Sequence, residues 1–161
     1  MEHLLTFEHV EAVLERYAAE VERLYKSRLE ESGRRAEGSL INSVRCVVEA
    51  GVSSYEVMLS LEEYWKYVEY GTRPHWPPVS AILRWVQVKP VIPRPDAKGR
   101  IPTQKQLAYL ISRKISRVGT EGSNDLRRTL EEVNAEYLPQ LEEALAQDAS
   151  DYVTRILIST P

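Results

Sequence analysis

The spacing of the apolar residues changes twice along this chain, and that change limits its possible folds more than any other feature. Over the first thirty residues, apolar side chains recur every three or four positions, which is typical of an amphipathic helix. Between Val44 and Leu61 they alternate with polar residues, as in a half-buried strand. From Thr103 onward the helical spacing returns. This order predicts an α+β fold: a long N-terminal helix, an antiparallel β-hairpin or small sheet, a short aromatic helix and a helix-rich C-terminal half.

The first half of the chain divides into a helix and two strands. The helix is predicted over residues 7–31, with Thr6 as its N-cap because a threonine hydroxyl can accept a free backbone N–H. Antiparallel strands are expected within SVRCVVEAG (43–51) and SYEVMLSL (54–61), because β-branched and aromatic residues alternate with polar ones there. The glycine and serines between these segments predict a turn.

Two shorter helices are predicted in the middle of the chain. Ser60 and Glu63 have the spacing of a capping box, which indicates a helix that opens at about Leu61. Gly71 is placed to end it in a left-handed conformation. The run Val79–Val88 puts Ile82, Trp85 and Val86 on one face, which indicates the next helix.

Prolines and a second capping box organise the next part of the chain. Residues 89–102 contain four prolines and are predicted to form an extended loop. Thr103 and Gln106 predict the start of a helix. Its expected inward residues are Leu107, Leu110, Ile111 and Ile115, and its expected outward residues are Arg113, Lys114 and Arg117.

The last helical pattern begins at Asn124 and contains Pro139. Because a proline inside a helix removes one hydrogen bond, we expect either a kink near Glu136 or two successive helices. With 161 residues, the chain is predicted to be a single domain. Within it we expect a core over about 1–89, a proline-rich arm over about 89–102 and a helical part over about 103–161.

Charge is unevenly distributed along the chain. From Arg84 to Arg117 there are nine basic residues and one acid, Asp96, a local charge of +8 in a chain of net charge −3, so the remainder carries −11. Such a basic segment fits phosphates, and it equally fits the acidic helices of a neighbouring copy. The sequence leaves both readings open.

The sequence contains no pattern typical of catalysis. Its single cysteine, Cys46, lies in an alternating apolar run and is interpreted as a buried thiol. Its three histidines lack the spacing of a zinc pair, and its glycines form no phosphate-binding loop. We therefore expect no enzyme, no cofactor and no metal site. No apolar run is long enough to cross a membrane, and we expect synthesis in a cytoplasm without membrane contact.

The most specific segment is YWKYVEYGTRPHWPPVSAILRWVQVK, residues 64–89. Its aromatic residues lie about one helical turn apart, which predicts a short helix whose rings pack against another surface. The pattern Y-x-x-Y-V-E-x-G-T resembles the neck or tail-completion proteins of tailed bacteriophages, also called head–tail connector or minor tail proteins. The matching residues are Tyr64, Tyr67, Val68, Glu69, Gly71 and Thr72. The order of helix, hairpin and aromatic helix agrees with that family, whereas the part from Thr103 onward is longer and more helical than in its smaller members.

The resemblance implies a structural virion protein that forms a homo-oligomeric ring between the portal and the tail. Its implied partners are further copies of itself, a portal or adaptor protein, and tail proteins. The basic segment would face a neighbouring subunit or, alternatively, contact packaged DNA without reading its sequence. The interface candidates are Tyr64, Tyr67, Val68, Glu69, Gly71, Thr72, Trp76 and Trp85. The basic-face candidates are Arg94, Lys98, Arg100, Arg113, Lys114 and Arg117.

An alternative interpretation is a DNA-binding regulator that uses the basic segment 103–128. The helix from Thr103, a glycine-containing turn and the helix from Asn124 resemble a helix-turn-helix, with Asn124, Arg127 and Arg128 as base-reading candidates. Two features oppose it. The joining turn is longer than usual, and the second helix soon becomes acidic.

Overall fold

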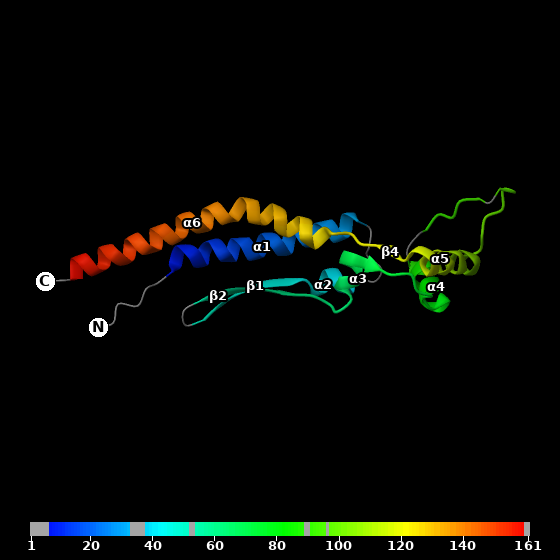
Figure 1. Cartoon of the computed structure of the whole chain (residues 1–161), viewed down its shortest axis with the longest axis horizontal. Helices are drawn as coiled ribbons and strands as arrows, with labels where there is room; N and C mark the ends of the chain where they lie inside the picture. Colours follow the sequence, from blue (N-terminus) through cyan, green and yellow to red (C-terminus); the bar gives the residue numbers. More distant parts are fainter. Residues whose placement is uncertain (1–6, 33–37, 52–53, 89–90, 96, 160–161) are drawn as a thin grey trace. The chain divides into compact units, whose positions relative to one another are not determined.

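The computed structural model describes residues 7–32, 38–51, 54–88, 91–95 and 97–159 (Figure 1). It confirms the predicted α+β class, with a long N-terminal helix, a small antiparallel sheet and a helix-rich C-terminal half. The elements in chain order are α1 (Glu8–Glu31), α2 (Ser39–Ser43), β1 (Arg45–Ala50), β2 (Tyr55–Ser60), α3 (Trp65–Tyr70), β3 (Gly71–Thr72), α4 (Val79–Val88), α5 (Gln104–Val118), β4 (Thr120–Glu121) and α6 (Asp125–Ser159).

The chain forms two compact units, and neither is continuous in sequence. Unit 1 comprises Met1–Leu29, Ser43–Leu61 and Asp125–Pro161, and unit 2 comprises Glu30–Asn42 and Glu62–Asn124. The first and last helices therefore share a unit with the β1–β2 hairpin. The short elements and the proline-rich arm form the other unit. The prediction of a single domain stays a prediction.

Unit 1 is built on α1 and α6, which run antiparallel (Figure 1). Val13, near the start of α1, packs with Ala144 of α6, whereas Val21 packs with Val133 farther along. Later residues of α1 thus pack against earlier residues of α6, as expected for antiparallel helices. The rings of Tyr17 and Tyr137 meet edge to face between these contacts, with centroids 5.9 Å apart. The long helices are held mainly by this buried apolar seam.

The start of α1 is capped by a residue from the other end of the chain. One oxygen of the Asp148 carboxylate accepts the N–H of Val10 at 2.9 Å, and the other accepts the N–H of His9 at 3.1 Å. Nδ1 of the His9 ring lies 2.7 Å from the same carboxylate. Thr6, the predicted N-cap, lies outside the described residues. Asp148 thus satisfies two free donors of α1 and fixes the register of α6 against it.

The predicted β-hairpin is confirmed. β1 pairs antiparallel with β2, with Arg45 opposite Ser60 and Val48 opposite Val57. The inward side chains follow the predicted alternation. Val44, just before β1, and Cys46 are buried, and Val48 packs partly buried against the core of unit 1.

Helix α6 runs without a break from Asp125 to Ser159, so the predicted alternative of two successive helices is wrong. Figure 1 shows the helix bowed along its length. Pro139 has no N–H to donate, and the side-chain amide of Gln140 donates to the Glu136 carbonyl at 3.2 Å. Pro139 is exposed, so water can reach the carbonyl that lost its partner.

In unit 2, α4 packs closely against α5. Ala108 and Ser112 of α5 are fully buried, four residues apart on one face, and Val86 of α4 is buried as well. Small residues at this spacing let two helices approach each other. The predicted capping box of α5 is confirmed, because the hydroxyl of Thr103 accepts the Gln106 N–H and the Gln106 side chain accepts the Thr103 N–H.

Two predictions for unit 2 are wrong. The aromatic helix begins at Trp65 and not near Leu61, because Ser60 is still paired with Arg45 in the hairpin and cannot act as a cap. Leu110 was expected inward but is 48% exposed, since the inward stripe of α5 is centred on the small residues that contact α4. The predicted exposure of Arg113, Lys114 and Arg117 is confirmed.

Residues 91–95 and 97–103 contain no helix or strand, in agreement with the predicted arm, whose first two residues and Asp96 lie outside the described part of the chain. The search of the described residues finds no helix that is long and apolar enough to span a membrane.

Candidate interaction surface

The aromatic motif ends in a two-residue ladder. β3 pairs antiparallel with β4, so that Gly71 faces Glu121 and Thr72 faces Thr120. The hydroxyl oxygens of the two threonines lie 2.9 Å apart. The Gly-Thr of the motif is thus paired with a second Gly-Thr, at 119–120, about fifty residues later.

Three glycines allow these two segments to meet backbone to backbone. A Cβ on Gly71 would lie 2.1 Å from the carbonyl oxygen of Thr120, and one on Gly119 would lie 2.0 Å from that of Thr72. A Cβ on Gly122 would lie 2.1 Å from the carbonyl oxygen of Glu69. Gly71 and Gly119 also have positive φ angles of 74° and 72°. No other residue fits these positions without moving the backbone.

The prediction for Gly71 is confirmed in part. Its φ is positive and its N–H donates to the Tyr67 carbonyl, as expected of a residue that ends a helix. Its ψ is −166°, which lies outside the left-handed helical region. The chain therefore leaves α3 directly in the extended conformation of β3.

The ladder fixes α3 on one side. The carbonyl of Val68 accepts the Ser123 N–H at 2.9 Å, and the carbonyl of Glu69 accepts the Asn124 N–H at 3.1 Å. The Glu69 side chain is only 1% exposed. These backbone contacts hold the end of α3 against the segment 119–124, and they give a physical reason for the glycine of the motif, which has no room for a Cβ there.

The tyrosines of the motif differ in their surroundings. The Tyr64 hydroxyl accepts the Leu40 N–H at 2.9 Å and lies 2.8 Å from the Ser39 hydroxyl, so this side chain holds the start of α2. Tyr67 and Tyr70, in contrast, are 64% and 70% exposed. Two large aromatic side chains are thus exposed on α3, and the opposite, buried side of this helix holds it in place.

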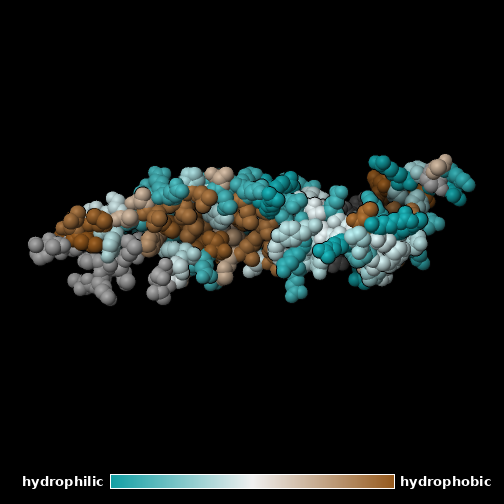
Figure 2. All heavy atoms as spheres, in the orientation of Figure 1, coloured by the Kyte–Doolittle hydropathy of each residue, from teal (hydrophilic) through white to brown (hydrophobic). Residues whose placement is uncertain are grey.

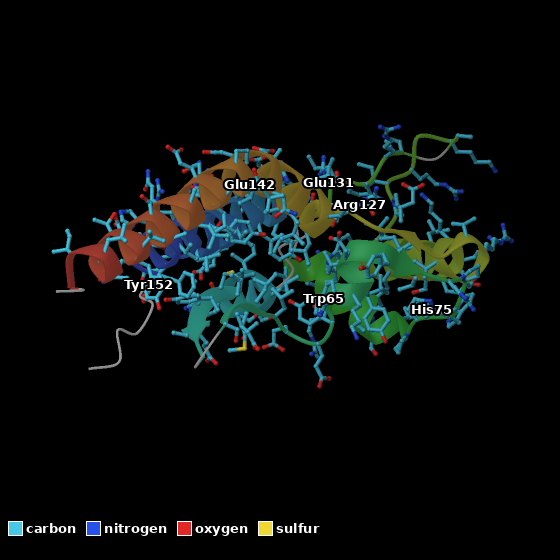
Figure 3. The ribbon with its side chains drawn as sticks, turned by 60° about the vertical axis from the view of Figure 1, so that its left-hand side comes forward. Trp65, His75, Arg127, Glu131, Glu142 and Tyr152 are labelled. Atoms are coloured by element: carbon cyan, nitrogen blue, oxygen red, sulfur yellow. The ribbon has the colours of Figure 1, made fainter. Side chains whose placement is uncertain are left out.

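The tryptophans of unit 2 lie on α3, on α4 and in the segment between them. Trp76 is 53% exposed, and its ring contacts that of Tyr109 on α5 with centroids 5.9 Å apart. Trp85 is half-buried on α4. Trp65, labelled in Figure 3, contacts Tyr70 at a centroid distance of 6.1 Å.

All six basic-face candidates are exposed, and five of them fall into two groups. Arg94 and Arg100 line a groove of about 790 Å³ together with Lys105, Tyr109 and Leu110. The second group, Arg113, Lys114 and Arg117, lies on the exposed side of α5, and Lys98 lies in the arm. Figure 2 shows hydrophilic residues gathered over this part of unit 2. The arrangement offers positive charge on an open surface.

The segment between α5 and α6 differs from a helix-turn-helix connection. It contains β4, and α5 packs on α4. Arg127 donates to Glu131 at 2.8 Å, and Arg128 donates to Asp125 at 2.5 Å. Figure 3 shows Arg127 and Glu131 close together on α6. The proposed base-reading arginines are therefore engaged with acids of their own helix, and the regulator stays a prediction that these contacts do not favour.

The single thiol, that of Cys46, is buried in the core of unit 1. Burial raises the pKa of Cys46 to about 11, and the negative charge of Glu22 adds to this effect. The backbone N–H of Cys46 donates to the Glu22 carboxylate at 2.9 Å. Among the described residues, no group of three or more His, Cys, Asp or Glu side chains is placed to hold a metal ion.

Sequence reasoning placed Gly119 and Gly122 at the end of the helix from Thr103, and Gly119 does end α5. It missed β4, the close approach of these glycines to the motif, and the contact of Tyr109 with Trp76. The signal for the ladder was present as the repeated Gly-Thr dipeptide, at 71–72 and 119–120. Comparison of the chain with protein-family models, curated proteins and solved structures finds no match.

Proposed function

We propose that this chain is a structural virion protein of a tailed bacteriophage, which assembles as a homo-oligomeric ring in the neck between capsid and tail. The observation that carries the proposal is the exposure of Tyr67 and Tyr70 on a helix fixed by the Gly-Thr ladder. Exposed tyrosines on a rigid element are typical of protein–protein interfaces, because they bury a large area at little cost in conformational entropy. The resemblance of the motif at residues 64–72 to neck proteins supplies the biological setting.

The charge distribution supports association between identical copies. A ring needs two different surfaces on each subunit, because its contacts join unlike faces. Unit 2 carries exposed basic residues on its arm and on α5, and unit 1 carries exposed acids along α6, among them the labelled Glu131 and Glu142 (Figure 3). Opposite charges of this kind favour a head-to-tail contact and disfavour contact between like faces.

The partners proposed beyond the ring are a portal or adaptor protein on one side and tail proteins on the other. The exposed basic residues of unit 2 suit an acidic neighbour, and they equally suit sequence-independent contact with DNA in the channel. A salt-dependent gel shift with DNA of arbitrary sequence distinguishes these two uses from each other.

The proposal is tested by the mass of the purified protein in solution. Size-exclusion chromatography with light scattering, alone and with the candidate portal, is expected to show a homo-oligomer that binds portal. Tyr67→Ala and Tyr70→Ala are expected to reduce the oligomer while the subunit stays folded by circular dichroism, because both side chains are exposed in the single chain.

Tyr64→Phe serves as the contrasting variant. It removes a hydroxyl that bonds within the chain, so it is expected to cost about 1 kcal/mol of stability and to leave association intact. A wild-type protein that remains a monomer and binds neither portal nor tail proteins would rule the proposal out.

A further inference from the structure

Within the described residues, one edge of the hairpin of unit 1 has no strand partner. A two-stranded sheet has two outer edges, each with a row of backbone N–H and C=O groups. At the edge of β1, the Cys46 N–H is occupied by the Glu22 carboxylate. Along the outer edge of β2, no strand from the described part of the chain is paired.

The hydrogen bonds of the hairpin show which residues face that edge. The Gly51 N–H donates to the Ser54 carbonyl at 2.7 Å and closes the turn. Bonded and non-bonded pairs alternate along an antiparallel ladder, so the pair Val48–Val57 exchanges no backbone bonds. The N–H and C=O of Val57 therefore point outward, as do those of Tyr55, two residues away. Their side chains lie on the core-facing side of the sheet.

An apolar groove of about 190 Å³ runs beside this edge. It is lined by Val57 together with Val13, Leu14, Tyr137, Leu138 and Leu141. Leu138 is 53% exposed and Val57 is 36% exposed, so the groove opens to solvent. Figure 2 shows apolar residues gathered over α1 and α6 in unit 1. An extended segment that brings one aliphatic side chain fits both the groove and the strand edge.

The arm contains such a segment at Ile92-Pro93-Arg94-Pro95. Ile92 is 90% exposed. Ile92 and Arg94 each precede a proline, which restricts both to extended conformations. Pro93 and Pro95 have no N–H, so the donors of this segment, those of Ile92 and Arg94, lie along a single edge. The segment can therefore pair with a strand along one of its edges. Its other edge has no proline N–H to donate, so no further strand can add there.

We propose that Ile92–Arg94 of a second copy adds antiparallel to β2 as a third strand, with Ile92 opposite Val57 and its side chain in the groove. The inference rests on the proposed homo-oligomer. In this register Arg94 lies opposite Tyr55, whose hydroxyl donates to the Glu11 carboxylate at 3.2 Å. Arg94 thus meets an acid of the neighbouring copy, whereas a parallel arrangement would place it beside Leu59.

Disulfide trapping tests the register. In a Cys46→Ala background, copies with Ile92→Cys and one tag are mixed with copies that carry Val57→Cys and a second tag, and the mixture is oxidised. Residues opposite each other in a bonded antiparallel pair have Cα atoms about 5.5 Å apart, within the range of a disulfide. A cross-linked product that carries both tags is expected. Ile101→Cys is the matched control, since Ile101 is an arm residue that is also well exposed, and it should give no such product.

The outcomes separate this inference from the proposed function. If light scattering shows the oligomer but no cross-link forms, strand addition is wrong while the ring stands. If a chain with both cysteines gives only an intramolecular disulfide, the arm pairs with its own hairpin and the inference is wrong. If the protein is a monomer at the concentration used, both fail, because there is no second copy to supply the strand.

A charge exchange tests the same register without cysteines. Arg94→Glu is expected to weaken association about tenfold at low salt, and Arg94→Glu combined with Glu11→Arg is expected to restore it. Arg16→Glu, at an exposed residue of α1 that belongs to neither group of candidates, is the matched single charge reversal for comparison. Equal weakening by Arg94→Glu with and without Glu11→Arg would exclude the antiparallel register.

Discussion

Among single residues, the missing side chains at Gly71, Gly119 and Gly122 constrain the candidate surface most. Each lies where a Cβ would be within about 2 Å of a carbonyl oxygen from the opposing segment. Because such a contact cannot be relieved by turning a side chain, the backbone itself would have to move. The placement of the exposed tyrosines thus depends on glycines that let the backbone of α3 lie against the segment 119–124.

Gly119→Ala is expected to destabilise unit 2 far more than Gly99→Ala. Both glycines have positive φ, 72° and 74°, so both substitutions carry about 1–2 kcal/mol of backbone strain. A Cβ on Gly99 meets nothing within 4 Å, whereas one on Gly119 meets the Thr72 carbonyl. Urea unfolding of both variants measures the difference, and equal losses would show that the close approach is not rigid.

The Asp148 cap predicts a dependence of stability on pH. Burial opposes ionisation of this carboxylate, but the N–H groups of Val10 and His9 and the His9 ring hold its pKa below the ordinary 3.8. Its contribution is therefore present above pH 3.8 and is lost as pH falls through the lower folded value. The hydrogen bond to Asp148 raises the pKa of His9 above 6.5, so the His9 contribution is present below pH 6.5 and is lost as pH rises through the folded value.

Asp148→Asn is expected to lower stability by about 1 kcal/mol at neutral pH, as the loss of a helix cap does, and to flatten both of these changes. Thermal unfolding measured from about pH 3 to about pH 8 covers the ordinary titration ranges of aspartate and histidine and reports both changes. A variant that keeps the acid-side fall of the wild type would show that other carboxylates cause it.

Among the elements, α6 stands out because it continues through Pro139. A proline in a helix interior costs about 3 kcal/mol relative to alanine, so the packing of α6 on α1 must outweigh that cost. Contacts lie on both sides of the proline, with Val133 packed before it and Ala144 after it. The bow of α6 keeps both contacts on one curved seam.

Pro139→Ala tests whether the bow is needed. If the helix keeps its contacts, the restored N–H is expected to raise the free energy of unfolding by about 1–3 kcal/mol, less any loss from a more flexible unfolded chain. Chemical denaturation followed by circular dichroism measures the change. A decrease in stability would instead indicate that the curved shape is required for packing on α1.

The long elements could be predicted because their signals are local. The spacing of Val10, Val13 and Val21 needs no knowledge of α6, and the alternation in β1 and β2 needs no knowledge of α1. β3 and β4 could not be predicted in this way, because two-residue strands have no period and their partners lie 48 positions apart. The start of α3 was misplaced for a related reason, since pairing across the hairpin used the residue that local spacing assigned to a cap.

For the whole molecule, the sequence identified the candidate residues. It could not predict which of them bond within the chain and which are exposed. Tyr64 and Tyr67 occur in one motif, yet one bonds to α2 and the other is exposed to solvent. That division depends on the fold around α3, which no spacing rule contains. The uneven charge was visible in the sequence, and the structure adds that its basic candidates are exposed.

Association through opposite charges predicts a weakening by salt. The screening length falls from about 10 Å at 0.1 M to about 3 Å at 1 M salt, so contacts between the basic segment and acidic helices should loosen over this range. Light scattering across that range is expected to show a decreasing mass at fixed protein concentration. A mass that rises with salt would indicate instead that apolar contacts such as those of Tyr67 dominate.

The pairing of Thr72 with Thr120 also makes the stretch between them a segment whose two ends lie next to each other. The chain departs and comes back through neighbouring strands, so both ends of this excursion are already joined. A shorter or longer segment in place of residues 73–118 would start and end next to the same two paired strands. Its length would add little to the entropy cost of closing the loop. A replacement of residues 73–118 is therefore expected to leave the β3–β4 ladder and unit 1 as they are.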